Sequence, residues 1–166
     1  MKRLRPEPEE DGRKAKRRHS RSAMAKPRIG WREWVHLPEL GGARVKAKVD
    51  TGARTSAIHA WNIAIAKSRG SVVVTFELHP RQRNDETIVP CRVPLIGMRA
   101  IRNSGGQIEN RYIIETVAEL GDHAWRIQLS LTQRDEMGFR MLLGRSALKG
   151  RFLVDPGRSF VLGPLR

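Results

Sequence analysis

Short runs of alternating apolar and polar residues follow one another from Gly30 onwards, and Gly, Pro, Asn or Asp separates them at close spacing. Alternation with a period of two is typical of strands that bury one face, and the separating residues favour turns. Residues 31–37 and 43–49 flank a connection that contains Pro and Gly, which predicts a hairpin leading into Asp50. The pattern as a whole predicts an all-β domain.

Further strands are predicted along the rest of the chain. The β-branched run 71–78 predicts a strand. Residues 87–96 include two prolines, which cannot donate to a ladder, and predict at most an edge strand. The turn sequence 103–106 predicts a projecting hairpin between 98–102 and 107–119. The remaining expectations are another hairpin strand at 125–131, a short strand at 139–144, one or two helical turns at 145–149, and closing segments at 152–154 and 160–162.

The length of 166 residues suits one domain with a tail. The formal charge of +15 indicates an acidic partner. Residues 1–27 hold 10 basic and 4 acidic residues (+6), which leaves 22 basic and 13 acidic residues (+9) for 28–166. We therefore expect a folded domain over 28–166.

Residues 1–27 are charged and offer almost nothing apolar to bury, which predicts a disordered tail. A basic arm that contacts RNA and a merely solvated tail are both compatible with this composition. Met24 directly precedes the first apolar pattern, so a translation start at Met24 is a third interpretation.

Cys91 is the single cysteine, which excludes an intrachain disulfide and a multi-cysteine zinc site. No apolar run reaches the ~18 residues of a membrane span, and the N-terminus lacks the apolar centre of a signal peptide. We expect a soluble, cytoplasmic protein with no membrane partner. Tyr112 is the only tyrosine, and the low aromatic content argues against a surface on which nucleic-acid bases stack.

The sequence Asp50-Thr51-Gly52-Ala53 comes where the predicted strand 43–49 ends. Gly52 permits a tight turn, and the hydroxyls of Thr51 and Thr55 can bond the local backbone. A carboxylate held on such a loop is what one half of an aspartic-protease site needs. A turn aspartate that caps its own loop is the alternative.

Four segments of the chain, including the one that begins at Asp50, resemble a known family. Residues 50–60, 131–137, 139–145 and 150–156 resemble a bacterial group of retropepsin-like aspartic proteases that carries the name "ATP-dependent zinc protease" and is associated with ATP-grasp glutamate ligases. Arg54 and Gln133 stand where lysine and asparagine are usual in that group. The resemblance spans about 30–163 and implies a closed retropepsin-like β-barrel with one short helix near the C-terminus.

The resemblance implies a catalytic Asp50 that needs a second aspartate, and the chain has only one Asp-Thr-Gly. A homodimer would supply the second copy. Thr51, Gly52, Ala53 and Thr55 form the active-site loop, and Leu142, Leu143, Gly144 and Arg145 would support it, with Arg145 anchoring a loop through a carboxylate such as Asp135. The candidate flap is Asn103, Ser104, Gly105 and Gly106.

No Gly-rich phosphate loop ending in Gly-Lys-Ser/Thr and no His-Glu-x-x-His is present, so neither ATP nor zinc is indicated, and we expect no cofactor. The first hypothesis is an aspartic peptidase or amide hydrolase acting on peptides or proteins, with acidic or glutamylated chains as candidate substrates. The second is a retropepsin-like module that binds RNA or ribonucleoprotein through its basic surface without catalysis. A zinc peptidase is the third.

Overall fold

The computed structural model describes residues 25–68, 70–82, 86–103, 105–133 and 138–163. Most of the predicted tail, together with Ser104 and Asp135, lies outside these ranges. Among the described residues, no helix has the length and apolar character needed to cross a membrane.

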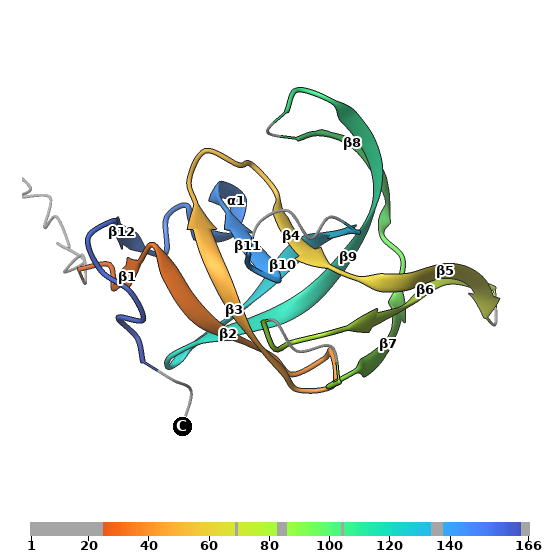
Figure 1. Cartoon of the computed structure of the whole chain (residues 1–166), viewed down its shortest axis with the longest axis horizontal. Helices are drawn as coiled ribbons and strands as arrows, with labels where there is room; N and C mark the ends of the chain where they lie inside the picture. Colours follow the sequence, from red (N-terminus) through yellow and green to blue (C-terminus); the bar gives the residue numbers. More distant parts are fainter. Residues whose placement is uncertain (1–24, 69, 83–85, 104, 134–137, 164–166) are drawn as a thin grey trace, which may run out of the picture.

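Six of the described strands close into a mixed barrel (Figure 1). Their bounds are β2 (Arg32–Leu37), β3 (Ala43–Asp50), β4 (Ser56–His59), β9 (Ile108–Leu120), β10 (His123–Thr132) and β11 (Met141–Gly144). The order is β10-β4-β11-β3-β2-β9, and β9 pairs with β10 to complete the ring. Both the predicted all-β class and the closed barrel are confirmed.

The barrel interior follows from the alternation in the sequence. Along β2 and β3 every second residue is buried, as the period of a strand with one core-facing side requires. The hairpin between them is confirmed, with Val35 opposite Val45. The core includes Val35, Leu37, Val45, Ala47, Ile58, Ile114, Leu129, Met141 and Leu143.

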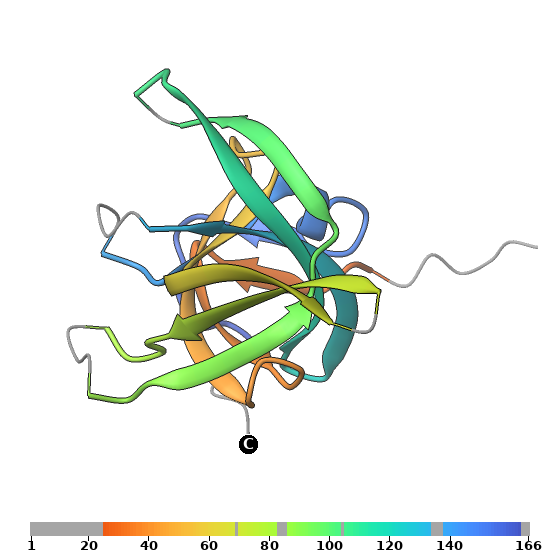
Figure 2. The same ribbon diagram turned by 90° about the vertical axis from the view of Figure 1, so that its right-hand side faces the viewer.

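A two-stranded arm projects from the barrel, as the turn sequence predicted. β8 (Gly97–Arg102) pairs with the first part of β9, from Arg102 opposite Ile108 to Gly97 opposite Ile113. β10 pairs with β9 only from Ile113 onwards, so 108–112 extend beyond the barrel. Figures 1 and 2 show this arm rising from the same end of the barrel as the connection between β3 and β4.

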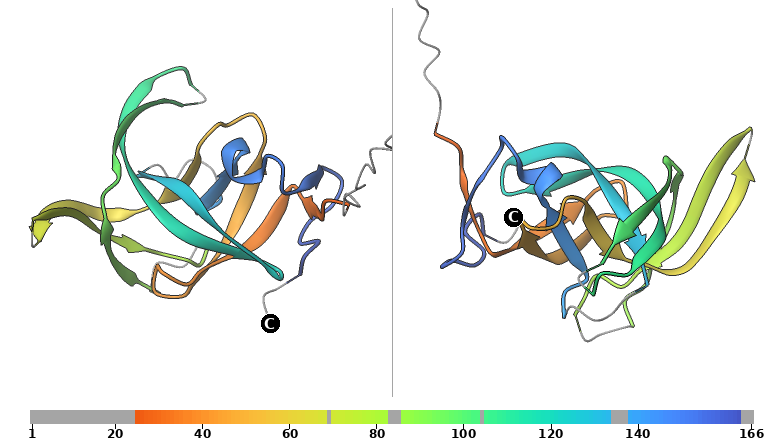
Figure 3. Two further views of the ribbon diagram at one scale, coloured as in Figure 1. Left: turned by 180° about the vertical axis from the view of Figure 1, so that it is seen from behind. Right: turned by 90° about the horizontal axis from the view of Figure 1, so that it is seen from above.

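A separate three-stranded sheet contains β5 (Trp61–Ser68), β6 (Ser71–Leu78) and β7 (Val89–Pro94) in that order. β6 confirms the predicted strand, and β7 is an edge strand, as its prolines require. Figures 1 and 3 show β5 and β6 extending away from the barrel. β5 was not predicted from the pattern.

The start and the end of the described chain meet. β1 (Arg28–Gly30) pairs in parallel with β12 (Leu153–Asp155), which follows the single turn of α1 (Arg145–Leu148). The closing segment 160–162 is a turn, in which Phe160 has a φ of 52° and its carbonyl accepts the N–H of Gly163 at 3.2 Å. The N–H of Phe160 donates to the carbonyl of Arg32 at 2.9 Å and ties this turn to β2. The Phe160 ring stacks on Trp34 with 6.1 Å between centroids.

Glu33 joins these terminal segments. Its side chain is fully buried, and Oε1 accepts the N–H of Gly30 at 2.7 Å and the N–H of Val161 at 2.8 Å. Buried backbone N–H groups need an acceptor, and a carboxylate makes these bonds stronger than a neutral oxygen would. One side chain of β2 therefore connects both ends of the domain to the barrel.

We expect Glu33→Ala to lower the free energy of unfolding by about 2–4 kcal/mol, because it leaves two N–H groups without their acceptor. Glu33→Gln keeps an oxygen there and should cost about 1 kcal/mol. The control is Glu115→Ala on the exposed outside of β9, with a change of about 0.5 kcal/mol or less. Urea unfolding measures all three. Equal losses for Glu33→Ala and Glu115→Ala would contradict this role.

Candidate active site

Asp50 is the last residue of β3, and Ser56 is the first residue of β4. Asp50 Oδ1 accepts the N–H groups of Gly52 and Ala53, each at 3.0 Å. The carboxylate therefore fixes the turn that follows it, as a turn aspartate does. Oδ2 has no hydrogen-bond partner among the described residues. One oxygen is used by the loop and the other is left for a further partner.

β11 lies between β3 and β4, the two strands that the loop connects. It runs parallel to β3, with Gly144 opposite Asp50, and antiparallel to β4, with Met141 opposite Ile58. Its residues Leu142 and Leu143 are buried. Leu142, Leu143 and Gly144 are thereby brought beside Asp50 although more than ninety residues separate them from it in sequence.

The backbone of Gly144 lies so close to the backbone of Thr55 and Ser56 that no side chain fits at this position. A Cβ atom there would lie 2.6 Å from the carbonyl carbon of Thr55 and 2.8 Å from the backbone nitrogen of Ser56. The N–H of Gly144 donates to Ser56 Oγ at 3.0 Å, and the backbone oxygen of Ser56 accepts a bond from Ser130 Oγ at 3.2 Å. Ser56 is buried and holds three strands together, a role that the sequence reasoning missed.

The first residues of α1 hold the other side of the loop. The N–H of Arg145 donates to the carbonyl of Ala53 at 2.7 Å, and that of Ser146 donates to the carbonyl of Arg54 at 3.0 Å. Arg145 Nη1 also donates to the carbonyl of Thr51 at 3.3 Å. Arg145 thus contacts the loop through a backbone carbonyl, whereas the expected partner Asp135 lies outside the described residues.

The loop presents its outer part to solvent. Thr51, Gly52 and Arg54 are exposed, and Ala53 and Thr55 are half-buried. The strands and the helix fix the backbone below, so the exposed part is held from one side only. Such a surface is available for a substrate or for another protein chain.

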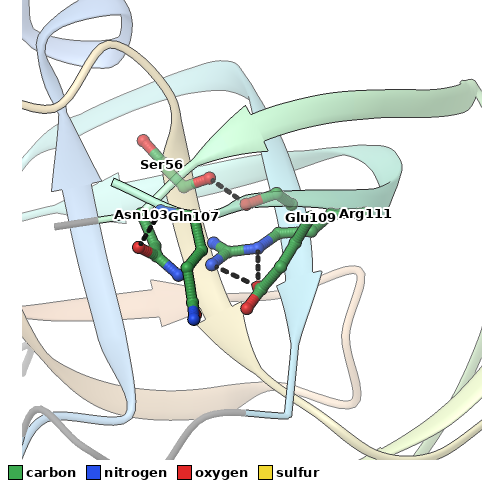
Figure 4. A network of polar contacts seen from close by, with 6 residues as sticks. Ser56, Asn103, Gln107, Glu109 and Arg111 are labelled. Carbon is green, nitrogen blue, oxygen red and sulfur yellow. Dashed lines mark hydrogen bonds and ion pairs between the residues drawn. The ribbon is translucent and has the colours of Figure 1, made fainter. Parts of the chain in front are cut away.

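The candidate flap lies at the tip of the arm. Asn103 closes the turn, because its carbonyl accepts the N–H of Gly106 at 3.0 Å and its Oδ1 accepts the N–H of Gln107 at 3.0 Å. Gly105 belongs to this tip, and Ser104 lies outside the described residues. Figure 4 shows Asn103 and Gln107 together with Arg111, whose Nη2 lies 2.9 Å from Glu109 Oε2. The Asn103 bonds close the turn, whereas Glu109 and Arg111 pair with each other along β9.

Other reactive side chains lie elsewhere. His59 and His79 both stack on the ring of Trp61, with 3.7 Å and 3.9 Å between ring centroids. The Cζ atom of the Arg140 guanidinium lies 4.7 Å from the centroid of the same ring. Burial raises the pKa of the Cys91 thiol to about 11, which keeps it protonated and poorly nucleophilic. The described residues contain no group of three or more His, Cys, Asp or Glu placed to hold a metal ion.

Residues 28–164 match the family model described as "RimB-like: Retropepsin-like aspartic endopeptidase RimB". Three relatives are each called "Probable alpha-L-glutamate ligase": the chain is 52% identical over 135 residues to that of Shewanella halifaxensis, 46% over 140 residues to that of Desulfotalea psychrophila, and 45% over 138 residues to that of Parasynechococcus marenigrum. These matches cover 81–84% of this chain but 30% of each relative.

A solved structure has the same fold. It is the protein Lpg0085 of Legionella pneumophila, described as having unknown function (DUF785). The TM-score is 0.70 at 25% identity, and the alignment covers 82% of this chain and 98% of that one. The fold therefore extends to a protein that consists almost entirely of this domain.

We expect Gly144→Ala to reduce stability by about 2 kcal/mol or more and to displace the loop, because the added methyl group overlaps backbone atoms that cannot move aside cheaply. The control is Gly157→Ala, whose Cβ would lie 3.4 Å from the Asp155 side chain, an ordinary contact. Urea unfolding gives the stabilities, and amide chemical shifts of 51–56 report the loop. A Gly144→Ala variant as stable as Gly157→Ala would contradict the close approach.

Proposed function

The chain belongs to the RimB-like family of retropepsin-like aspartic endopeptidases, and from this membership we propose that it hydrolyses amide bonds with Asp50 contributed by each of two copies. The observation that carries the proposal is the position of Asp50, fixed through Oδ1 on an exposed loop while Oδ2 has no partner among the described residues. A carboxylate in that state is available for chemistry.

The proposed reaction needs two carboxyl groups that share one proton, since two like charges at close range cannot both ionise. The ionised Asp50 removes a proton from water, and the resulting hydroxyl attacks the substrate carbonyl carbon. The protonated Asp50 of the other copy gives its proton to the carbonyl oxygen, which yields a tetrahedral diol. As the diol collapses, the ionised carboxylate removes a proton from one of its hydroxyls, the C–N bond breaks, and the other carboxyl group gives its proton to the leaving nitrogen, which returns the pair to one shared proton.

A two-fold axis beside the loop would bring two Asp50 side chains together. The exposure of Thr51 and Gly52 supports this arrangement, because small exposed residues let two loops approach and a hydroxyl can bond across the axis. β11 and α1 would hold each loop from behind. The arm of β8 and β9 would then serve as the flap that covers bound substrate and excludes water.

We further propose an acidic or glutamylated protein chain as the substrate, in the cytoplasm. The relatives named as glutamate ligases carry this domain within a longer chain, and a hydrolase that removes what a ligase adds would explain the combination. The net charge of +9 over 28–166 favours an acidic chain.

A binding module without catalysis is the alternative, and the same net charge favours it. It would bind RNA or ribonucleoprotein through the basic surface, with or without the tail. Phosphate contacts lose affinity steeply as salt rises. Tight, salt-sensitive RNA binding without amide cleavage would favour this alternative over hydrolysis.

We expect Asp50→Asn to lower kcat on a glutamylated peptide by on the order of 10²–10⁴-fold, because the amide retains the turn but cannot exchange the proton. Asp155→Asn is the matched control, since Asp155 Oδ1 accepts the N–H of Gly157 at 3.0 Å in a similar turn remote in sequence from the loop. The assay is release of the cleaved product. Undiminished cleavage by Asp50→Asn would refute the assignment.

We also expect sedimentation to show a dimer at the concentrations that give activity. If subunits exchange, a 1:1 mixture of wild type and Asp50→Asn should show about half the activity of the wild-type portion alone, because half of the wild-type subunits pair with inactive ones. Mixing with Asp155→Asn should show no such loss. If a fully exchanged 1:1 mixture with Asp50→Asn keeps the whole activity of its wild-type portion, a single chain is sufficient for catalysis.

A further inference from the structure

Arg54 has a fixed backbone and an unpaired side chain. It is the fourth residue after Asp50, and its carbonyl accepts the N–H of Ser146 at 3.0 Å. The side chain is exposed and has no hydrogen bond or ion pair with any described residue. Its guanidinium is therefore available to a ligand beside the loop.

Arg145, the neighbouring cation, is engaged differently. Its Nη1 donates to the carbonyl of Thr51 at 3.3 Å, so the loop itself uses that side chain. Arg111, on the arm, pairs with Glu109 at 2.9 Å. Of these three arginines, Arg54 is the one whose donors all remain available.

An acidic substrate needs such a cation. Two Asp50 carboxyl groups that share one proton carry one negative charge, which repels any carboxylate on the substrate. Two unit charges 4 Å apart interact by about 1 kcal/mol in water and by more where water is excluded. A guanidinium beside the loop offsets this repulsion, and its planar fork can bind a carboxylate with two parallel hydrogen bonds.

We propose that Arg54 binds a side-chain carboxylate of the substrate and makes the site selective for glutamate-rich chains. This inference rests on the proposed function and assigns a residue to its substrate class. In the proposed two-fold dimer each loop would bring its own Arg54, so one substrate chain could meet a guanidinium from each copy.

Binding to an inactive variant tests this role without catalysis. In the Asp50→Asn background, a fluorescent oligoglutamate peptide is titrated by anisotropy, with oligoglutamine as the uncharged comparison. Adding Arg54→Gln should raise the Kd for oligoglutamate about 10-fold or more, the loss expected for a charged hydrogen-bonded contact, and remove most of the preference over oligoglutamine. Arg54→Lys should retain part of the affinity because it keeps the charge but not the fork.

The control is Arg92→Gln, which removes the same charge from an exposed position on β7, a strand that Figure 1 shows on the side sheet, away from the loop. It should change the Kd less than twofold. Equal effects of Arg54→Gln and Arg92→Gln would overturn the role of Arg54 and indicate only net charge. No preference for oligoglutamate in the parent would also overturn it.

Activity assays distinguish the role of Arg54 in binding from the proposed hydrolysis on which it rests. In the active protein, Arg54→Gln should lower the ratio of kcat/KM for the glutamate peptide to that for the glutamine peptide, mainly through KM. Arg54-dependent binding with no cleavage by wild type would refute the proposed hydrolysis while supporting the binding role. Cleavage with an unchanged ratio would refute the role of Arg54 alone.

Discussion

The structure depends on the insertion of β11 between β3 and β4. Strands joined by a five-residue loop would ordinarily pair with each other, but here a segment from more than eighty residues later separates them. The separation forces the loop to cross over the end of β11, where the backbone of Gly144 lies against that of Thr55. Only glycine fits there, because it has no Cβ atom, so the closure of the barrel and the position of the loop both depend on the glycine at residue 144.

This constraint explains why Asp50 can be both a turn residue and a candidate catalytic group. The loop needs one carboxylate oxygen to organise the N–H groups of Gly52 and Ala53. The support from Ser56, Arg145 and Ser146 reaches the loop from below and leaves the second oxygen without a partner among the described residues. The turn role therefore uses one oxygen of the side chain, and the proposed catalytic role would use the other.

Periodicity predicted the local hairpins because a half-buried strand must alternate. It missed β5, since only Ala60 separates this strand from β4 and no Gly or Pro marks the boundary. It also missed the parallel pairing of β1 with β12, which joins segments 125 residues apart (Arg28 and Leu153) and has no local signal. The buried roles of Glu33 and Ser56 depend on backbone groups from distant strands, which no spacing in the sequence reveals.

The arm extends a barrel strand instead of forming a separate unit. The even-numbered residues of β9 face the core from Ile114 to Leu120, where they are fully buried, but Ile108 on the same face is 63% exposed. On β8, Met98 shares that face opposite Tyr112 and is 58% exposed. An isolated hairpin is only marginally stable in water. Continuity with β9 anchors this one while Ile108 and Met98 stay exposed to solvent, and the proposed flap would need that combination because a substrate would have to displace water from these side chains and later leave them.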